Sequence, residues 1–495
     1  MCFRTVRRAV GLGFLMLAVL GTLNGNLSGQ TAGTSVPLNT VWRVLVNPTE
    51  RMSTIDRNER NNFSPDEGSI FYITQSNISG TAPLYREFNG FDHMESNIWD
   101  EANYWTESTL GYPWTTPAPF GTTQIIRGYN SATQDHATRN IYETLSGYDT
   151  EGFTLYGYRR YNFLSTSLVT LAPPGLKLFV SSNEVAGGSV WSWTWTDNNN
   201  NLIDPINTWD FGREMQSSLF PHDHSGLANW DSNPTEAGDG ASNSGASPVD
   251  RSGSPLYVPI FTNGNVQKTR AIPLEFNPGH FGGGTTVPYK PVIWKDVIIG
   301  KDLTLNFNNL GKVAKYSTQI HIPNDISNAD VEIPTIYVTG NYNVYWTYDA
   351  VIQKLTPLSS TDVPDACAAA TKGNGSPQYS FGFGGVIVSD GTDHSNAHAI
   401  GIYGGTPQAN GPGSVDYFAL WNFTKATECG FAAGVSKYDF GSSKLNAVAK
   451  ARNLTANSQN PLDAAFYTTF NTWVMSGSID EITSYMNSLY AAGVK

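Results

Sequence analysis

The chain has 495 residues and a formal net charge of −12, and only 15% of its residues are charged. Binding to a phosphate backbone requires clustered Lys and Arg, so nucleic acid is excluded as an expected partner. Hydrophobic residues make up 40% of the chain, enough for the cores of more than one domain. Aromatic residues at 12%, with 48 Gly and 27 Pro, favour many short strands joined by turns.

The N-terminus has the pattern of a secretory signal peptide. Arg4, Arg7 and Arg8 precede the apolar stretch 9–23, which is too short for a settled membrane span. We predict a signal peptide at residues 1–29. The mature protein is then expected outside the cell or in a periplasm, with no membrane insertion.

The cysteines fit this location. Removing Cys2 with the signal leaves Cys367 and Cys429. Two cysteines in an oxidising compartment predict one disulfide, and two free buried thiols are the alternative.

Residues 36–161 contain three copies of a repeat of about 42 residues. Each copy begins with an arginine followed by an asparagine. The aligned positions are Arg43, Arg86 and Arg127; Asn47, Asn89 and Asn130; Arg51, Asp92-His93 and Asp135-His136; Thr54, Ser96 and Thr138; Glu59, Glu101 and Glu143; and Glu67, Glu107 and Glu151.

The second copy reads LYREFNGFDHMES and the third IIRGYNSATQDHATRNIYETLSGYDTEGFTLYGY. They resemble a bacterial repeat family with the pattern YRxxN, DHxxT, E and GYxxEGxxGY, found on secreted, often cell-wall or polysaccharide-associated proteins. The resemblance implies a β-trefoil-like, sugar-binding module at 36–161, with Arg86, His93, Arg127 and His136 as its repeat residues. The first copy has lost the Asp-His pair, so a pocket that needs this pair is expected to be missing there.

The repeated charges have two interpretations. One is a sugar site, for which Trp99, Trp105, Trp114 and Tyr129 are the candidate aromatic platforms. The other is an internal set of salt bridges that satisfies the same buried polar groups in every copy. In that case the aromatic residues can equally belong to the core.

Residues 162–495 show short apolar or alternating runs without crossover helices, which predicts a large antiparallel β-sandwich. The alternation in SVWSWTWT places Trp191, Trp193 and Trp195 on one face. Near the C-terminus, Ser478 as N-cap, Glu481 three residues later and Gly493 as the stop predict one amphipathic helix packed on the sandwich.

Four segments of this region, NEVAGGSVWSW, WDFGREMQSSLF, NPTEAGD and NPGHFGGG, carry a second resemblance. Over 176–493 the chain is similar to secreted bacterial proteins with a GRxxQ strand and an NPxxAGD loop, which look like the galactose-mutarotase-type supersandwich. That fold is shared by sugar epimerases and by domains of polysaccharide lyases and glycoside hydrolases. A shared fold does not transfer an activity.

Candidate chemistry gathers around 209–239. The proposed catalytic residues are Glu214, Glu236, His222 and His280, and the proposed substrate-binding residues are Arg213, Gln216, His224 and Asp239. A hydrolase would use two of the carboxylates, and a lyase would pair a histidine base with an arginine or an amide. An epimerase would use His280 as acid and Glu236 as base. One residue set fits all three mechanisms.

The triplet His222-Asp223-His224 also has the spacing of two metal ligands, but Pro221 and Ser225-Gly226 on its flanks indicate a surface loop. We therefore predict neither a metal nor a cofactor. The loop 390–398, which contains His394 and His398, is expected to be a solvated turn.

The sequence thus predicts an exported all-β protein, with a β-trefoil-like module followed by a supersandwich-like domain that ends in a helix. Its expected partner is a polysaccharide or another glycan, which it binds and either cleaves or epimerises. The alternative is a non-catalytic carbohydrate-binding adhesion protein of the cell surface or matrix.

Overall fold

The computed structural model describes residues 35–63, 66–116, 122–140, 143, 145–159, 168–207, 214–221, 234–238, 253–275, 292–364, 378–405, 415–422, 443–456 and 468–494. The predicted signal peptide, the predicted domain boundary at 161/162, and Cys367 and Cys429 lie outside these residues. Among the described helices, none is both long and apolar enough to cross a bilayer.

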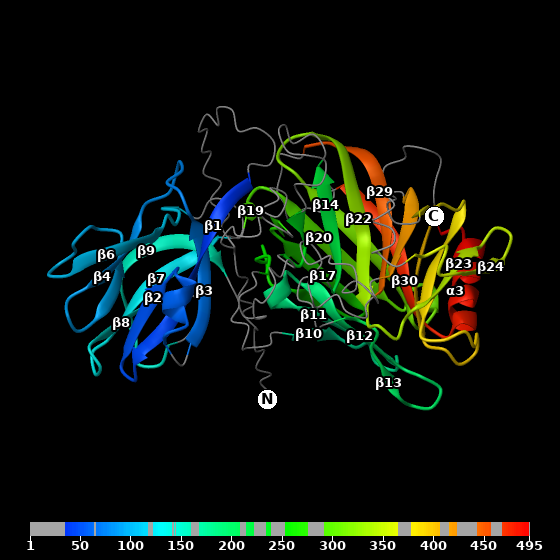
Figure 1. Cartoon of the computed structure of the whole chain (residues 1–495), viewed down its shortest axis with the longest axis horizontal. Coiled ribbons are helices and arrows are strands. Elements are labelled where there is room, and N and C mark those ends of the chain that lie inside the picture. The colour runs from blue at the N-terminus through cyan, green and yellow to red at the C-terminus, as the bar shows by residue number, and fades with distance from the viewer. Residues whose placement is uncertain are drawn as a thin grey trace, which may run out of the picture. The chain divides into compact units, whose positions relative to one another are not determined.

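Each copy of the repeat folds into a three-stranded antiparallel sheet whose first strand lies in the middle. The strands, blue to cyan in Figure 1, are β1 (Ser35–Asn47), β2 (Glu50–Thr54), β3 (Asp66–Thr74), β4 (Leu84–Phe88), β5 (His93–Ser96), β6 (Trp105–Gly111), β7 (Thr122–Asn130), β8 (Asp135–Asn140) and β9 (Asp149–Arg159). A short helix, α1 (Arg57–Arg60), follows β2.

The three small sheets share one apolar core. Val41, Leu84 and Ile125, one from the first strand of each repeat, belong to it and are fully buried. The repeat is therefore a structural unit that cannot bury its apolar face alone. The β-trefoil remains a prediction, because the strand pairings establish a three-stranded sheet in each repeat and do not test the trefoil fold.

The remaining strands build two large antiparallel sheets. The first runs β10-β11-β12-β14-β22-β29-β28-β25. The second, of nine strands, runs β16-β17-β20-β21-β30-β27-β26-β23-β24. Short strands β13, β15, β18 and β19 extend the first sheet, and β19 pairs with the start of β1.

These elements are β10 (Leu168–Leu171), β11 (Leu178–Asn183), β12 (Ser189–Thr196), β13 (Leu202–Ile203), β14 (Met215–Pro221), β15 (Pro234–Thr235), β16 (Phe261–Asn263), β17 (Val266–Ala271), β18 (Leu274–Glu275), β19 (Val292–Trp294), β20 (Ile298–Leu305), β21 (Val313–His321), β22 (Ile326–Val338), β23 (Val344–Asp349), β24 (Lys354–Leu358), β25 (Gln378–Tyr379), β26 (Phe383–Ser389), β27 (Ala399–Gly405), β28 (Tyr417–Asn422), β29 (Ser443–Leu454), β30 (Thr468–Gly477) and α3 (Ile479–Ala491), with 3-10 turns at Glu184–Ala186 and Phe307–Asn309.

The main core lies between the two large sheets, and it contains Trp193 and Trp195 from β12. Trp191 does not join them. The β11–β12 ladder shifts between Ser181 and Ser182, which leaves Trp191 as the extra residue, and its ring packs against a different cluster. The prediction of one shared face is therefore wrong for Trp191.

The C-terminal helix is confirmed. Ser478 accepts from the Glu481 amide, and the Glu481 carboxylate accepts from the Ser478 amide at 2.9 Å, which completes the capping box. Helix α3, red in Figure 1, buries Ile482 and Met486 on the face of the nine-stranded sheet opposite the main core. The predicted all-β class, the sandwich and its helix are thus all observed.

Candidate functional site

The repeat arginines lie at equivalent places in the three central strands. Arg43 faces Ser53 across its ladder, Arg86 faces Glu95, and Arg127 faces Thr138. Thr138 therefore corresponds to Ser53 and not to Thr54, which corrects the sequence alignment at that position. Each arginine also donates from Nη1 to the main-chain oxygen of one of these facing residues in another repeat. Arg43 donates to Thr138, Arg86 to Ser53 and Arg127 to Glu95.

Each arginine joins two glutamates, one from its own repeat and one from the preceding repeat. Within a repeat, the Nε–carboxylate distances are 2.5 Å for Arg43–Glu67, 3.0 Å for Arg86–Glu107 and 3.1 Å for Arg127–Glu151. Between repeats the pairs are Arg43–Glu143, Arg86–Glu59 at 2.7 Å and Arg127–Glu101 at 3.0 Å. The first repeat binds the third, the second binds the first, and the third binds the second, so the contacts close into a cycle.

Burial makes these pairs consequential. Arg43 is only 4% exposed. Burial alone would lower its pKa, but the hydrogen bonds and charges of Glu143 and Glu67 raise it. The charges and hydrogen bonds of Arg43 and Arg51 lower the pKa of Glu67 against the opposing effect of its own burial. Arg43 and Glu67 are therefore both ionised at neutral pH. Removal of either one leaves the other with a single ion-pair partner, Glu143 for Arg43 or Arg51 for Glu67.

A glycine gives the third-repeat arginine its room. Gly152 has a φ of 70°, and a Cβ there would lie 2.8 Å from Nε of Arg127. The Glu-Gly pair seen in the sequence at 151–152 thus places the carboxylate while leaving space for the guanidinium.

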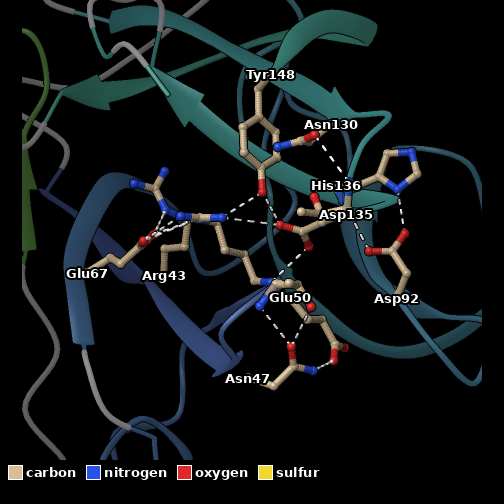
Figure 2. Close-up of polar contacts among 12 residues, drawn as sticks. Arg43, Asn47, Glu50, Glu67, Asp92, Asn130, Asp135, His136 and Tyr148 are labelled. Carbon is tan, nitrogen blue, oxygen red and sulfur yellow. Dashed lines mark hydrogen bonds and ion pairs between the residues drawn. The ribbon is translucent and has the colours of Figure 1, made fainter. Parts of the chain in front are cut away.

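A second cycle of contacts between repeats is formed by the acidic residue and the histidine or arginine that follow the repeat asparagine. His136 Nδ1 lies 2.5 Å from Asp92 Oδ2 of the second repeat, and the pair is drawn in Figure 2. In the same way His93 Nδ1 lies 2.6 Å from Glu50 of the first repeat. Arg51 completes the cycle, with Nη1 at 3.4 Å from Asp135 Oδ2 of the third repeat.

The first repeat has therefore not lost the function of the Asp-His pair. Glu50 and Arg51 replace the aspartate and the histidine, and they make the equivalent inter-repeat contacts. Asp135 also accepts from the Tyr148 hydroxyl, which Figure 2 shows directed at the carboxylate. Two closed cycles of charge thus hold the three repeats together, as the salt-bridge interpretation of the repeated residues predicts.

The aromatic residues do not follow this symmetry. In the second repeat Trp99 is 60% exposed, Trp105 is 50% exposed and Phe91 is 88% exposed. Trp114, by contrast, is buried in the core, and Tyr129 is half-buried over His136 with ring centroids 4.7 Å apart. Of the four predicted platforms, only two are freely exposed.

The exposed rings are held by neighbours. Trp105 meets Phe88 edge to face at 5.5 Å, and Phe88 stacks on His93 at 4.3 Å. Glu107, two residues after Trp105 on the same strand, has a side chain 28% exposed and accepts from Arg86. The β4–β6 ladder shifts between Arg86 and Glu87, which leaves Glu107 as the extra residue of β6, so the apolar ring and the hydrogen-bond acceptor lie two residues apart on this strand without being fixed to one face by alternation.

The described residues of the first and third repeats do not form this surface. Two residues before their matching glutamates, Glu67 and Glu151, stand Pro65 and Asp149 instead of a tryptophan. Phe88 and Phe91 were not predicted as site residues. Their signal was their position on either side of Asn89, at the turn between the first two strands of the repeat.

The predicted catalytic cluster of the sandwich domain is described only in part. Glu236 has no exposed surface, and its Oε1 lies 2.7 Å from Nζ of Lys301, which is also fully buried. The Thr269 hydroxyl donates to the same carboxylate at 2.9 Å, and the Tyr316 hydroxyl lies 3.4 Å away. Burial lowers the pKa of Lys301 against the raising effect of Glu236.

Glu214 and Gln216 are also buried, at 0% and 3% exposure. The Gln216 side chain accepts from the Ala237 amide at 2.9 Å, which ties β14 to the segment after β15. Described members of the cluster thus serve as internal contacts between strands. The other proposed residues, Arg213, His222, His224, Asp239 and His280, lie outside the described residues.

The part of the chain that the structure describes contains no group of three His, Cys, Asp or Glu side chains that could hold a metal ion. The triplet His222-Asp223-His224 lies outside that part.

No family model matches the sequence, and no curated protein sequence matches it either. Among solved structures, the chain is similar to a galactose mutarotase-like protein from Clostridium acetobutylicum, with 8% identity, a TM-score of 0.31, and coverage of 64% of this chain and 96% of that one. A GalM/aldose epimerase homologue from C. elegans gives 9% identity, a TM-score of 0.28, and coverage of 63% and 98%. A 4-alpha-glucanotransferase from Thermococcus litoralis gives 8% identity, a TM-score of 0.24, and coverage of 63% and 38%. Similarity at this level assigns no activity to the chain.

Proposed function

We propose that this chain is an exported, non-catalytic carbohydrate-binding protein, and that it binds glycan through the exposed aromatic surface of its second repeat. The observation that carries this proposal is the exposure of Trp99 and Trp105, at 60% and 50%, in the second repeat, which the described parts of the first and third repeats do not match. Exposed tryptophan is not needed to close the charge cycles. Its retention on the surface is explained by a ligand that covers it.

The chemistry of this surface suits a sugar. Aromatic rings offer a flat apolar face, on which the C–H face of a pyranose can stack. Glu107 beside Trp105 offers carboxylate oxygens as acceptors for sugar hydroxyls. The net charge of −12 favours a neutral glycan over a polyanionic one.

Burial of the described carboxylates supports binding without catalysis. A general acid or base must reach the bond that it acts on, and neither Glu214 nor Glu236 has exposed surface. In this proposal, Glu236 with Lys301 stabilises the sandwich, and the glycan stays intact.

The test is a glycan array probed with the mature protein and with the double variant Trp99→Ala/Trp105→Ala. Loss of two stacking contacts, each worth about 0.5–1.5 kcal/mol beyond burial, is expected to weaken binding by about tenfold or more. The matched control is Phe261→Ala, which removes a ring 51% exposed in β16 of the sandwich domain. Binding that survives the double variant unchanged would contradict the proposal, and loss of binding in the control would do so as well.

A further inference from the structure

A polar hollow of about 170 Å³ lies in the sandwich domain, and none of the predicted site residues lines it. Four segments far apart in the sequence meet there: the β12–β13 loop at 197–201, Lys312 before β21, the end of the β26–β27 loop at 395–398, and the junction of β30 with α3. The loop 390–398 is a turn, as predicted, but its end forms one wall of this hollow.

Asp197 is fixed as an acceptor on the first wall. The amides of Asn199 and Asn201 each donate to its Oδ1 at 2.8 Å, and the Asn201 side chain donates to Oδ2 at 3.0 Å. These contacts, above all that of the Asn201 side chain, lower the pKa of Asp197 to about 2. The carboxylate is therefore ionised and held in one orientation.

His398 connects this wall to the next. Its Nδ1 lies 2.8 Å from Asp390 Oδ2, and its Nε2 lies 3.3 Å from Asp197 Oδ2. The two loops are thus tied through one imidazole, whose side chain is 27% exposed.

Two further lining residues, Lys312 and Glu481, neutralise each other. Lys312 Nζ lies 3.0 Å from Glu481, and the same carboxylate accepts from the Ser478 amide at the start of α3. The helix N-terminus is therefore occupied by its own capping box and does not invite an anion.

The charges of the lining disfavour an anionic ligand. Lys312 and Glu481 neutralise each other, which leaves the negative charge of Asp197 in the hollow. The oxygens of Asp197 already accept three hydrogen bonds and face His398, which leaves little capacity for a metal.

What remains is a surface of neutral groups that both donate and accept. The asparagines of the lining are Asn198, Asn199, Asn201 and Asn396, and Ser395 adds a hydroxyl. Asn201 already donates to Asp197, and Asn396 and Ser395 donate to Asp393, so these three offer their remaining capacity. Trp195 also lines the hollow, but it is 1% exposed and belongs to the main core, so it offers almost no apolar surface to a ligand. The volume is below the roughly 300–1,000 Å³ of pockets for drug-sized ligands, so it suits one ring and not a chain of rings.

We propose that this hollow binds a single saccharide ring, as a second carbohydrate site that does not involve Trp99 or Trp105. The inference shares with the proposed function only the class of ligand. It makes the sandwich domain a second point of contact with a glycan, for which a terminal sugar is the fitting part.

The experiment uses the full mature chain with Trp99→Ala/Trp105→Ala, so that the surface of the second repeat contributes nothing. Galactose, glucose, mannose and N-acetylglucosamine are offered singly, with saturation-transfer NMR and calorimetry as readouts. At least one is expected to bind with a dissociation constant on the order of millimolar, since only a few hydrogen bonds are gained. Adding Asn198→Leu/Asn396→Leu is expected to weaken that binding at least about tenfold. The matched control Asn341→Leu changes an exposed turn asparagine that does not line the hollow.

The outcomes separate the two sites. Absence of binding by any of the four sugars, or binding that survives Asn198→Leu/Asn396→Leu in a protein of unchanged melting temperature, would overturn the second site. If the leucine variants alone abolish glycan binding while Trp99→Ala/Trp105→Ala does not, the hollow stands and the aromatic surface fails. A leucine variant that does not fold is replaced by Ser395→Trp, which fills the hollow from its rim, with the same expected loss.

Discussion

The second repeat differs from the first and third in what it exposes, although all three share the same charged contacts. Each repeat supplies one arginine and two glutamates to the first cycle, and an acid with a histidine or arginine to the second. Only the second repeat adds Trp99 and Trp105 at the surface. The charged residues that follow the threefold symmetry are explained by assembly, and we propose that Trp99 and Trp105, which break it at the surface, contact a ligand.

The largest expected effect concerns assembly. Arg43→Met removes a buried cation and leaves Glu67 and Glu143 without it, so the free energy of unfolding is expected to fall by about 3–5 kcal/mol. Urea unfolding followed by circular dichroism measures the loss. Arg86→Met is the matched comparison, and because its side chain is 12% rather than 5% exposed, its cost should be smaller. Equal and negligible losses would show that the cycle does not hold the repeats together.

The pH dependence of stability tests the same cycles, because two groups of carboxylates change the stability in opposite directions as the pH rises. The pKa values of Glu59, Glu67 and Glu101 are lowered by their arginines, so their contribution is present above about pH 4.5 and is lost as the pH falls below it. Burial raises the pKa of Asp135 to about 6, so its contribution is present at low pH and is lost as the pH rises from 3.8 to about 6.

Melting temperature against pH is therefore expected to pass through a maximum near pH 5. Asp135→Asn should flatten the fall above that maximum and leave the acid limb in place. If Asp135→Asn also removed the loss of stability at acid pH, Asp135 and the three glutamates would not contribute independently to the pH dependence.

A smaller effect is expected from making the first repeat like the others. Glu50→Asp with Arg51→His restores the Asp-His pair of the second and third repeats. Because Glu50 and Arg51 already make the equivalent contacts, the change in unfolding free energy should stay within about 1 kcal/mol. Thermal denaturation measures it, and a loss like that of Arg43→Met would show that the first repeat is not equivalent.

The smallest effect on stability is expected where the symmetry is broken. Trp105→Asp gives the second repeat the residue found at this place in the third. Because Trp105 is 50% exposed, its replacement should lower the free energy of unfolding by less than about 1 kcal/mol. Calorimetry of unfolding checks this, and a larger loss would assign the ring to the core.

Much of the fold could be predicted because its signals are local. The repeat spacing identified three units, the alternating runs identified the sandwich, and Ser478 with Glu481 fixed the start of the last helix. Local patterns also misled, because the bulge that displaces Trp191 has no signature in an alternating run.

The candidate sites were harder, since they depend on contacts between distant residues. Nothing in the sequence pairs Glu236 with Lys301, yet their contact explains why both are buried. Trp99, Trp105 and Trp114 look alike in the sequence, and Trp114 differs because it is buried in a cluster that includes Ile272 and Ile293 of the sandwich domain. The hollow at Asp197 requires four segments to meet and was not predicted at all.

The most direct test is calorimetric titration of an array-selected glycan into the wild-type protein, Trp105→Asp and Phe261→Ala, all with matched melting temperatures. Our account predicts that Trp105→Asp, which removes one stacking contact worth about 0.5–1.5 kcal/mol, loses about two- to tenfold in affinity while Phe261→Ala binds as the wild type does. Unchanged affinity in Trp105→Asp would contradict the assignment of the second repeat as the glycan-binding surface.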